Sequence, residues 1–260
     1  MNARILSRVF ATFALGGAFV PLFALCPLGA SSAKREGPEA EERFFPLEQG
    51  STWVYRGTVR WFDPEKQQPS SEDVSIITKV ERVYQKPEFA MAVLSGFPAD
   101  LDWSTGQVEP KPSLLIETQK HEIFLDALPP DFDYSKLEKD ASTLDKFLSA
   151  DNLMFRWPLE KGMKFGDAES VKRDDNHYCW VVAGRKTKNL GAIKGLPSRE
   201  ADVFLLRFDT NPDDTSIELA KGVGILQYEY HHHGTVADTE LALVEFHKGP
   251  AASQRARTGQ

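Results

Sequence analysis

The segment from Glu229 to His233 carries the residues best suited to chemistry, in the order Glu, Tyr, His, His, His. Alternate side chains of a β-strand project from one face, with neighbours about 7 Å apart. Glu229, His231 and His233 would therefore share a face. Two imidazoles at this spacing can bind one zinc ion if a third ligand comes from elsewhere in the chain. The segment thus predicts a zinc site at Glu229, His231 and His233, which would serve a metal-dependent hydrolase.

Other features of this segment favour a solvated histidine cluster without a cofactor. Gly234 follows directly, so the histidines would lie in or beside a turn where alternation fails. Tyr230 shares its face with Tyr228 and Leu226, which is typical of a core face and leaves the other face to solvent. The missing ligand would have to be a distant histidine: His121, His177 or His247. A proton-responsive role also stays open, because imidazole titrates near neutral pH.

Other catalytic patterns are missing from the sequence. It has no Gly-x-Ser-x-Gly nucleophile motif and no glycine-rich phosphate loop. Cys179 lies in an apolar run, which predicts an inert, buried thiol. The pairs Asp174-Asp175 and Asp213-Asp214 lie in polar, loop-like stretches, where we expect solvated carboxylates instead of acid–base or calcium-binding groups. The sequence therefore favours a non-catalytic protein.

Aromatic side chains supply a candidate binding surface. From Ser51 to Trp61, the residues Trp53, Tyr55 and Trp61 alternate with polar ones, which predicts a half-buried strand. Aromatic residues on a sheet face usually belong to the core. The alternative is an open, concave sheet whose aromatic lining holds an apolar or glycan ligand. Trp53, Tyr55 and Trp61 are then the candidate ligand-binding residues.

The elements that must position these residues are mostly strands. Period-two alternation predicts further strands over 73–84, 89–97, 113–126 (as a hairpin), 178–185, 203–209, 224–230 and 239–247. Leu137, Leu144 and Leu148 recur at helical spacing, which predicts one amphipathic helix over residues 135–149. The expected fold is mainly β, with an antiparallel sheet or a curved, incomplete β-barrel.

A short motif occurs twice. The first copy is Pro46-Leu47-Glu48-Gln49-Gly50 and the second is Pro158-Leu159-Glu160-Lys161-Gly162. Proline fixes the backbone before a turn, and glycine allows the positive φ that swings the chain into a sheet. We expect both copies to lead into equivalent halves, 44–150 and 155–248, of one β-rich domain at 44–248.

The N-terminus has the three parts of an export signal. A positive start with Arg4 and Arg8 precedes an apolar stretch over residues 9–25, and small residues end at Ala33. This pattern predicts a signal peptide at 1–33, and hence a periplasmic or extracellular protein. The alternative is an uncleaved membrane anchor at 9–25. The charged residues 34–43 are expected to form a flexible leader, and residues 249–260 a disordered tail.

The negative net charge of the chain limits the kinds of partner that we expect. Removing Arg4 and Arg8 with the signal peptide leaves 29 basic residues against 38 acidic ones, a formal charge of −9 compared with −7 for the whole chain. An acidic domain repels phosphate backbones, so nucleic acid is not expected as a partner. The expected partners are an envelope component or a small apolar or glycan ligand.

Three motifs together resemble a known pattern. Residues Pro46 to Tyr55 follow Pro-Leu-x-x-Gly-x-x-Trp-x-Tyr, a second Pro-Leu-x-x-Gly occurs at 158–162, and Gly222-Val223-Gly224 precedes the last predicted hairpin. The pattern is similar to that of bacterial secreted and lipoprotein-like proteins of unknown function. The resemblance spans most of residues 44–247. It implies a β-rich envelope protein and carries over no catalytic residue.

Overall fold

The computed structural model describes residues 43–98, 101–102, 107–108, 111–129, 131–139, 141–233 and 237–250. These residues belong to one compact unit, 35–260, and a second unit comprises residues 1–34. The predicted signal peptide, nearly all of the predicted leader, and residues 251–260 of the predicted tail lie outside the described residues. None of the helices in the described ranges is long and apolar enough to cross a membrane.

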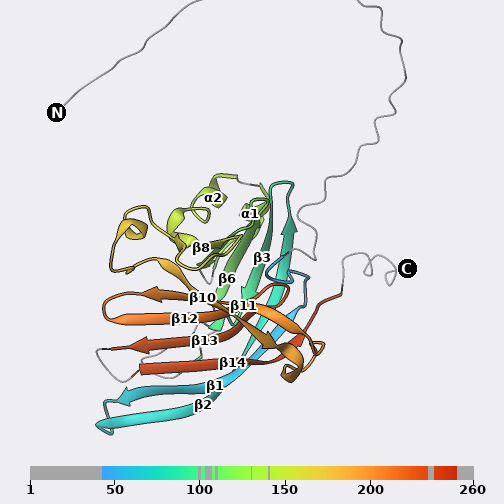
Figure 1. Cartoon of the computed structure of the whole chain (residues 1–260). Coiled ribbons are helices and arrows are strands. Elements are labelled where there is room, and N and C mark those ends of the chain that lie inside the picture. Colours follow the sequence, from blue (N-terminus) through green and yellow to red (C-terminus); the bar gives the residue numbers. More distant parts are fainter. Residues whose placement is uncertain are drawn as a thin grey trace, which may run out of the picture. The chain divides into compact units, whose positions relative to one another are not determined.

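Strands dominate the described part of the chain (Figure 1). The first run comprises β1 (Thr52–Asp63), β2 (Gln68–Gln85), β3 (Phe89–Ser95), β6 (Pro112–Thr118), β7 (Glu122–Ala127) and β8 (Leu153–Arg156). The second run comprises β9 (Lys164–Phe165), β10 (Trp180–Asn189), β11 (Glu200–Asp209), β12 (Asp213–Ala220), β13 (Gly224–His232) and β14 (Ala237–His247). The short strands β4 (Leu101–Asp102) and β5 (Gln107–Val108) pair with each other.

The two runs form a single antiparallel sheet. Within the described residues it has 12 strands, in the order β8-β7-β6-β3-β2-β1-β14-β13-β12-β11-β10-β9. Each run is an up-and-down meander, and β1 joins them by pairing with both β2 and β14. The sheet curls until its edge strands β8 and β9 approach each other, which makes a nearly closed, barrel-like structure. The predicted mainly-β fold is confirmed.

The two Pro-Leu turns make the same hydrogen bonds. Gly50 has φ of 88° and Gly162 has φ of 90°, values that favour glycine. The Gly50 N–H donates to the Val80 carbonyl at 2.8 Å, and the Gly162 N–H donates to the Val182 carbonyl at 2.8 Å. Each valine N–H donates back, at 2.9 Å, to the carbonyl of the residue after the glycine. A β-bulge follows each valine. The repeated sequence therefore builds the same local structure in both runs.

The predicted single helix is wrong in its extent. The described residues contain two short helices, α1 (Ser135–Lys139) and α2 (Ala141–Asp145), besides the 3₁₀ turns at Ala150–Asn152, Ser170–Lys172 and Leu190–Ala192. Residues 146–149 form turns and bends instead of a last helical turn. The Phe147 N–H donates to the Leu144 carbonyl at 2.9 Å, three residues back. The Leu148 N–H donates to the same carbonyl at 3.0 Å, and Phe147 is 2% exposed, so the segment leaves the helical path while its apolar side chains stay buried.

The helical segment lies against the outer face of the first run. The Asp133 carboxylate accepts a hydrogen bond from the Ser135 N–H at 3.0 Å. Asp133 thus caps the first turn of α1. The guanidinium of Arg82, on β2, lies 4.7 Å from the ring centroid of Tyr134. These contacts hold the short helices over the sheet.

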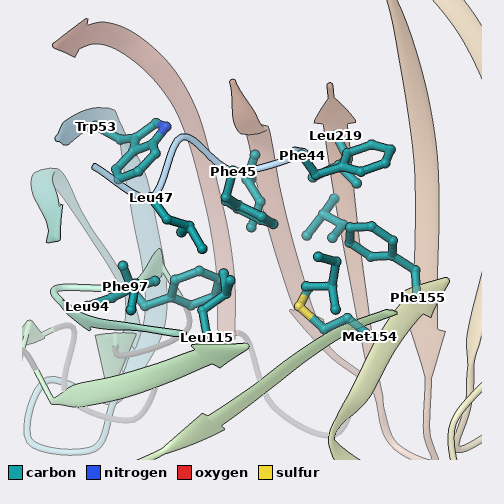
Figure 2. Close-up of a cluster of buried hydrophobic side chains, with 14 of the residues drawn as sticks. Phe44, Phe45, Leu47, Trp53, Leu94, Phe97, Leu115, Met154, Phe155 and Leu219 are labelled. Carbon is teal, nitrogen blue, oxygen red and sulfur yellow. The ribbon is translucent and has the colours of Figure 1, made fainter. Parts of the chain in front are cut away.

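Residues 43–47 fill the interior between the two runs. Phe44, Phe45 and Leu47 are 1%, 4% and 2% exposed. Figure 2 shows their side chains among those of Leu115, from the first run, and Leu219, from the second. The interior is therefore packed with the chain's own apolar side chains.

Two of the motifs that resemble those of secreted proteins, at 46–55 and 222–224, contact each other in this interior. The Trp53 indole donates to the Val223 carbonyl at 2.6 Å, and the Tyr55 hydroxyl donates to the Ile225 carbonyl at 2.9 Å. Gly224 lies between these carbonyls with φ of 95°, and a Cβ there would come within 2.7 Å of the Phe45 ring. Glycine is needed at this position both for its φ and for the close approach.

Candidate ligand-binding site

The inner face of the sheet brings one predicted site residue, Trp61, to the same end as polar residues of β12 and β13. Trp61 of β1 pairs with Ala237 of β14, Ala237 pairs with His232 of β13, and His232 pairs with Asp213 of β12. These four side chains form a cross-strand row. Trp61 and His232 are two strands apart, which corresponds to roughly 10 Å.

The next row along the same strands adds further aromatic and hydroxyl groups. In strand order it runs Val59, Thr239, Tyr230, Thr215, Phe208 and Trp180. Trp180 and Phe208 lie with ring centroids 5.3 Å apart. Trp61, Asp213, Tyr230 and His232, from the two rows, are called the inner-edge site below. Their side chains are partly exposed, unlike those in the core.

Hydrogen bonds join the polar members of the inner-edge site. The Tyr230 hydroxyl donates to Asp213 Oδ1 at 3.0 Å, and His232 Nδ1 contacts the same oxygen. The His232 and Asp213 side chains are 16% and 34% exposed. Burial and the hydrogen bond to Asp213 raise the pKa of Tyr230. The phenol therefore stays protonated and keeps donating to the carboxylate. The site offers polar groups beside an aromatic ring.

The three predicted zinc ligands have separate partners. Glu229 accepts a hydrogen bond from the Ser216 hydroxyl at 3.0 Å on the outer face. His231 Nδ1 lies 3.0 Å from Asp238 Oδ1. His233 follows the end of β13, and its Nε2 lies 3.7 Å from an Asp214 oxygen. Within the described residues, no group of three or more His, Cys, Asp or Glu side chains is arranged to hold a metal ion.

The distant histidines also lie beside carboxylates. The pairs are His121 with Glu117, His177 with Asp175 and His247 with Glu245. None of these carboxylates is one of the residues that contact His231 or His233. Cys179 is buried, and burial raises the pKa of its thiol.

The three aromatic residues that were predicted to bind a ligand lie in two different environments. Trp53 and Tyr55 are 2% and 3% exposed and hydrogen-bonded to backbone carbonyls in the core. Trp61 is partly exposed and packs at the edge of the core. Of the three, Trp61 is the one that belongs to the inner-edge site.

Asp213 and His232 were missed as site residues. Asp213 follows Asn211-Pro212, and its polar neighbours resemble a loop, although it begins β12. Alternation through Thr215, Ile217 and Leu219 was the available signal, since these residues share its face. His232 lies on the face of Tyr230, which the same periodicity assigns to the inner side.

Comparisons with known proteins show few likenesses. No family model and no curated protein matches the sequence. A protein from Bacteroides fragilis described as exported, with a YmcC-like fold, is 12% identical; the match covers 80% of this chain and 100% of that one, with a TM-score of 0.39. A protein from Parabacteroides distasonis described as a lipoprotein is 16% identical, with 79% and 99% coverage and a TM-score of 0.37. These likenesses assign no function to this chain.

Proposed function

We propose that this chain is an exported, non-catalytic envelope protein that binds a glycan at the inner-edge site. The observation that carries the proposal is that Trp61 and the hydrogen-bonded group of Tyr230, Asp213 and His232 lie in two adjacent rows of the same partly exposed face. Export is supported by the charged, apolar and small-residue order of positions 1–33.

The chemistry of the inner-edge site suits a sugar. An indole ring offers an apolar face for the C–H face of a pyranose, and a few polar groups then fix the orientation. Asp213 accepts hydrogen bonds from hydroxyl groups, and His232 can donate or accept. The separation of roughly 10 Å between Trp61 and His232 suits an extended ligand. A purely apolar ligand is less favoured, because residues 43–47 already fill the apolar interior.

The inner-edge site lies at the end of the sheet opposite to the point where the chain enters it. The Arg43 carbonyl accepts from the Gly222 N–H at 3.0 Å, beside the start of β13. His232 ends β13, and Trp61 lies near the end of β1. In Figure 1 the β1–β2 hairpin accordingly lies at the lower left, away from the C-terminal end of β14.

Replacing Trp61 by alanine is expected to weaken glycan binding roughly fivefold, because stacking on an aromatic ring contributes on the order of 1 kcal/mol. Binding of the full chain is first screened on an array of glycans and then measured by calorimetry. Phe62→Ala is the matched control, since Phe62 is the next residue on the opposite face and is 39% exposed. The proposal fails if no glycan binds, or if Trp61→Ala and Phe62→Ala bind equally tightly.

Replacing Asp213 by asparagine is expected to weaken binding of the same glycan by roughly tenfold or more, because hydrogen bonds to a charged group contribute about 1.5–3 kcal/mol. Calorimetry at one pH gives the affinity of each variant. Asp174→Asn serves as the control, because Asp174 is an exposed loop carboxylate away from the two rows. Unchanged affinity in a folded Asp213→Asn protein would show that the carboxylate does not contact the ligand.

A further inference from the structure

The Glu117 side chain is buried on the inner face of the sheet. Its strand neighbours on the inner face are Ala90 of β3 and Ile123 of β7, and Ile123 pairs in turn with Phe155 of β8. Glu117 and all three neighbours are 0% exposed. Leu115, two residues earlier on the same face, belongs to the apolar cluster in Figure 2. The carboxylate thus lies at the edge of an apolar interior.

Hydrogen bonds do not offset the free-energy cost of burying this carboxylate. Neither oxygen of Glu117 makes a hydrogen bond of good geometry with the residues that the structure describes, and the backbone of Phe44 provides only a weak one. His121 Nδ1 approaches Glu117 Oε1 to 3.8 Å, from the turn between β6 and β7. A buried polar group without partners is costly, and a buried charge is costlier still.

Two basic side chains also act on Glu117. Arg43, which is 8% exposed, comes from the segment that fills the interior, and Lys221 comes from the turn between β12 and β13. Burial raises the pKa of Glu117 to about 7, although the charges of Arg43 and Lys221 and the backbone hydrogen bond from Phe44 oppose this shift. The carboxyl group therefore exchanges its proton near neutral pH. His121, Arg43 and Lys221 are the charged or titratable groups that face it from the neighbouring turns and the segment.

Residues 43–47 cover Glu117. The Phe44 ring packs on Phe155 with centroids 4.9 Å apart, and Phe155 is in the same row as Glu117. Arg43 donates to the Gln85 side chain at 3.3 Å, and its Nε atom is buried without a hydrogen-bond partner in the described part of the chain. Water can reach the carboxylate from this side only after the segment moves.

We propose that Glu117 is a proton-binding site that controls the docking of residues 43–47. The neutral carboxyl is tolerated in the closed interior, so the segment stays docked. The ionised carboxylate gains hydration when the segment lifts, so a rise in pH favours opening. The proposal is independent of glycan binding at the inner-edge site.

Hydrogen exchange of the full chain tests this coupling. Exchange of the amides of residues 43–45 and 47–49 is followed by mass spectrometry at pH 5.5 and pH 8, and each rate is corrected for its intrinsic pH dependence. Opening of the wild-type segment is expected to increase on the order of tenfold between these pH values, from the difference between the closed and open pKa of Glu117. Glu117→Gln is expected to abolish this increase, and Glu72→Gln, at an exposed strand position, is expected to retain it.

Equal pH dependence of opening in wild type and Glu117→Gln would overturn the proposal. Infrared difference spectra between pH 5.5 and pH 8 provide a second measurement that needs no exchange. The wild-type spectrum should contain the carbonyl band of a buried protonated carboxyl, and the Glu117→Gln spectrum should lack it. A wild-type spectrum without that band would also overturn the proposal.

Discussion

Replacing Gly57 by alanine is expected to lower the free energy of unfolding by about 3 kcal/mol. Gly57 lies in β1, opposite Leu241 of β14, at the seam that joins the two runs of strands. A Cβ at this position would come within 1.7 Å of the Glu240 carbonyl oxygen and 3.0 Å of the Leu241 Cα. Both atoms belong to the backbone, so β1 and β14 would have to separate.

Urea unfolding followed by tryptophan fluorescence gives the change in stability from the midpoint and slope. Gly184→Ala is the matched control, because Gly184 also lies in a strand and a Cβ there meets nothing within 4 Å. This control is expected to change the free energy of unfolding by no more than about 1 kcal/mol. Equal stability of the Gly57 and Gly184 variants would contradict the close approach of β1 and β14.

Replacing Glu117 by glutamine is expected to stabilise the protein by about 3 kcal/mol at pH 8 and by little at pH 4 or below. The pKa of Glu117 rises from an ordinary 4.5 to about 7 in the folded chain. Below pH 4.5, both the folded and the unfolded chain hold the proton, so the group does not affect stability through ionisation. Between pH 4.5 and 7 the unfolded chain has lost the proton that the folded chain keeps. The contribution of Glu117 to the wild-type free energy of unfolding therefore falls by about 1.4 kcal/mol per pH unit.

Above pH 7 both states are ionised, and this contribution levels off. Urea unfolding of wild type and variant at several pH values between 4 and 8 measures the effect. The difference between the two curves isolates Glu117, because every other titrating group is common to both. Glu72→Gln should give a curve parallel to that of wild type. A constant difference between wild type and Glu117→Gln at all pH values would show that Glu117 keeps an ordinary pKa.

Local patterns predicted the parts of the fold whose causes are local. The alternation of Trp53, Tyr55 and Trp61 with polar residues predicted β1, and the two Pro-Leu turns predicted matching backbone conformations at Gly50 and Gly162. A strand's period of two comes from its own pleat, and a glycine's positive φ comes from its missing Cβ. Neither requires knowledge of a distant partner.

The strand β12 and the helical segment show where local patterns fail. Asp213 and Asp214 read as a loop, yet β12 is held by hydrogen bonds to both β11 and β13. The leucine stripe predicted one helix over 135–149, but α2 ends at Asp145 and the segment leaves the helical path with Phe147 buried. In each case a contact made after folding outweighs the local preference.

Some features of the candidate site likewise follow from local patterns, and the others depend on tertiary contacts. The sequence by itself determined that Trp61 and Tyr230 face the inner side of their strands and that the segment at 229–233 is rich in histidine. The tertiary structure alone decided that Trp53 and Tyr55 are core residues, since they donate hydrogen bonds to carbonyls 170 residues away. It also decided that Asp213 joins Tyr230 and His232, and that Glu117 is buried without a hydrogen bond of good geometry among the described residues. Alternation determines which face of a strand a side chain occupies, whereas burial and partners depend on which strands lie beside it.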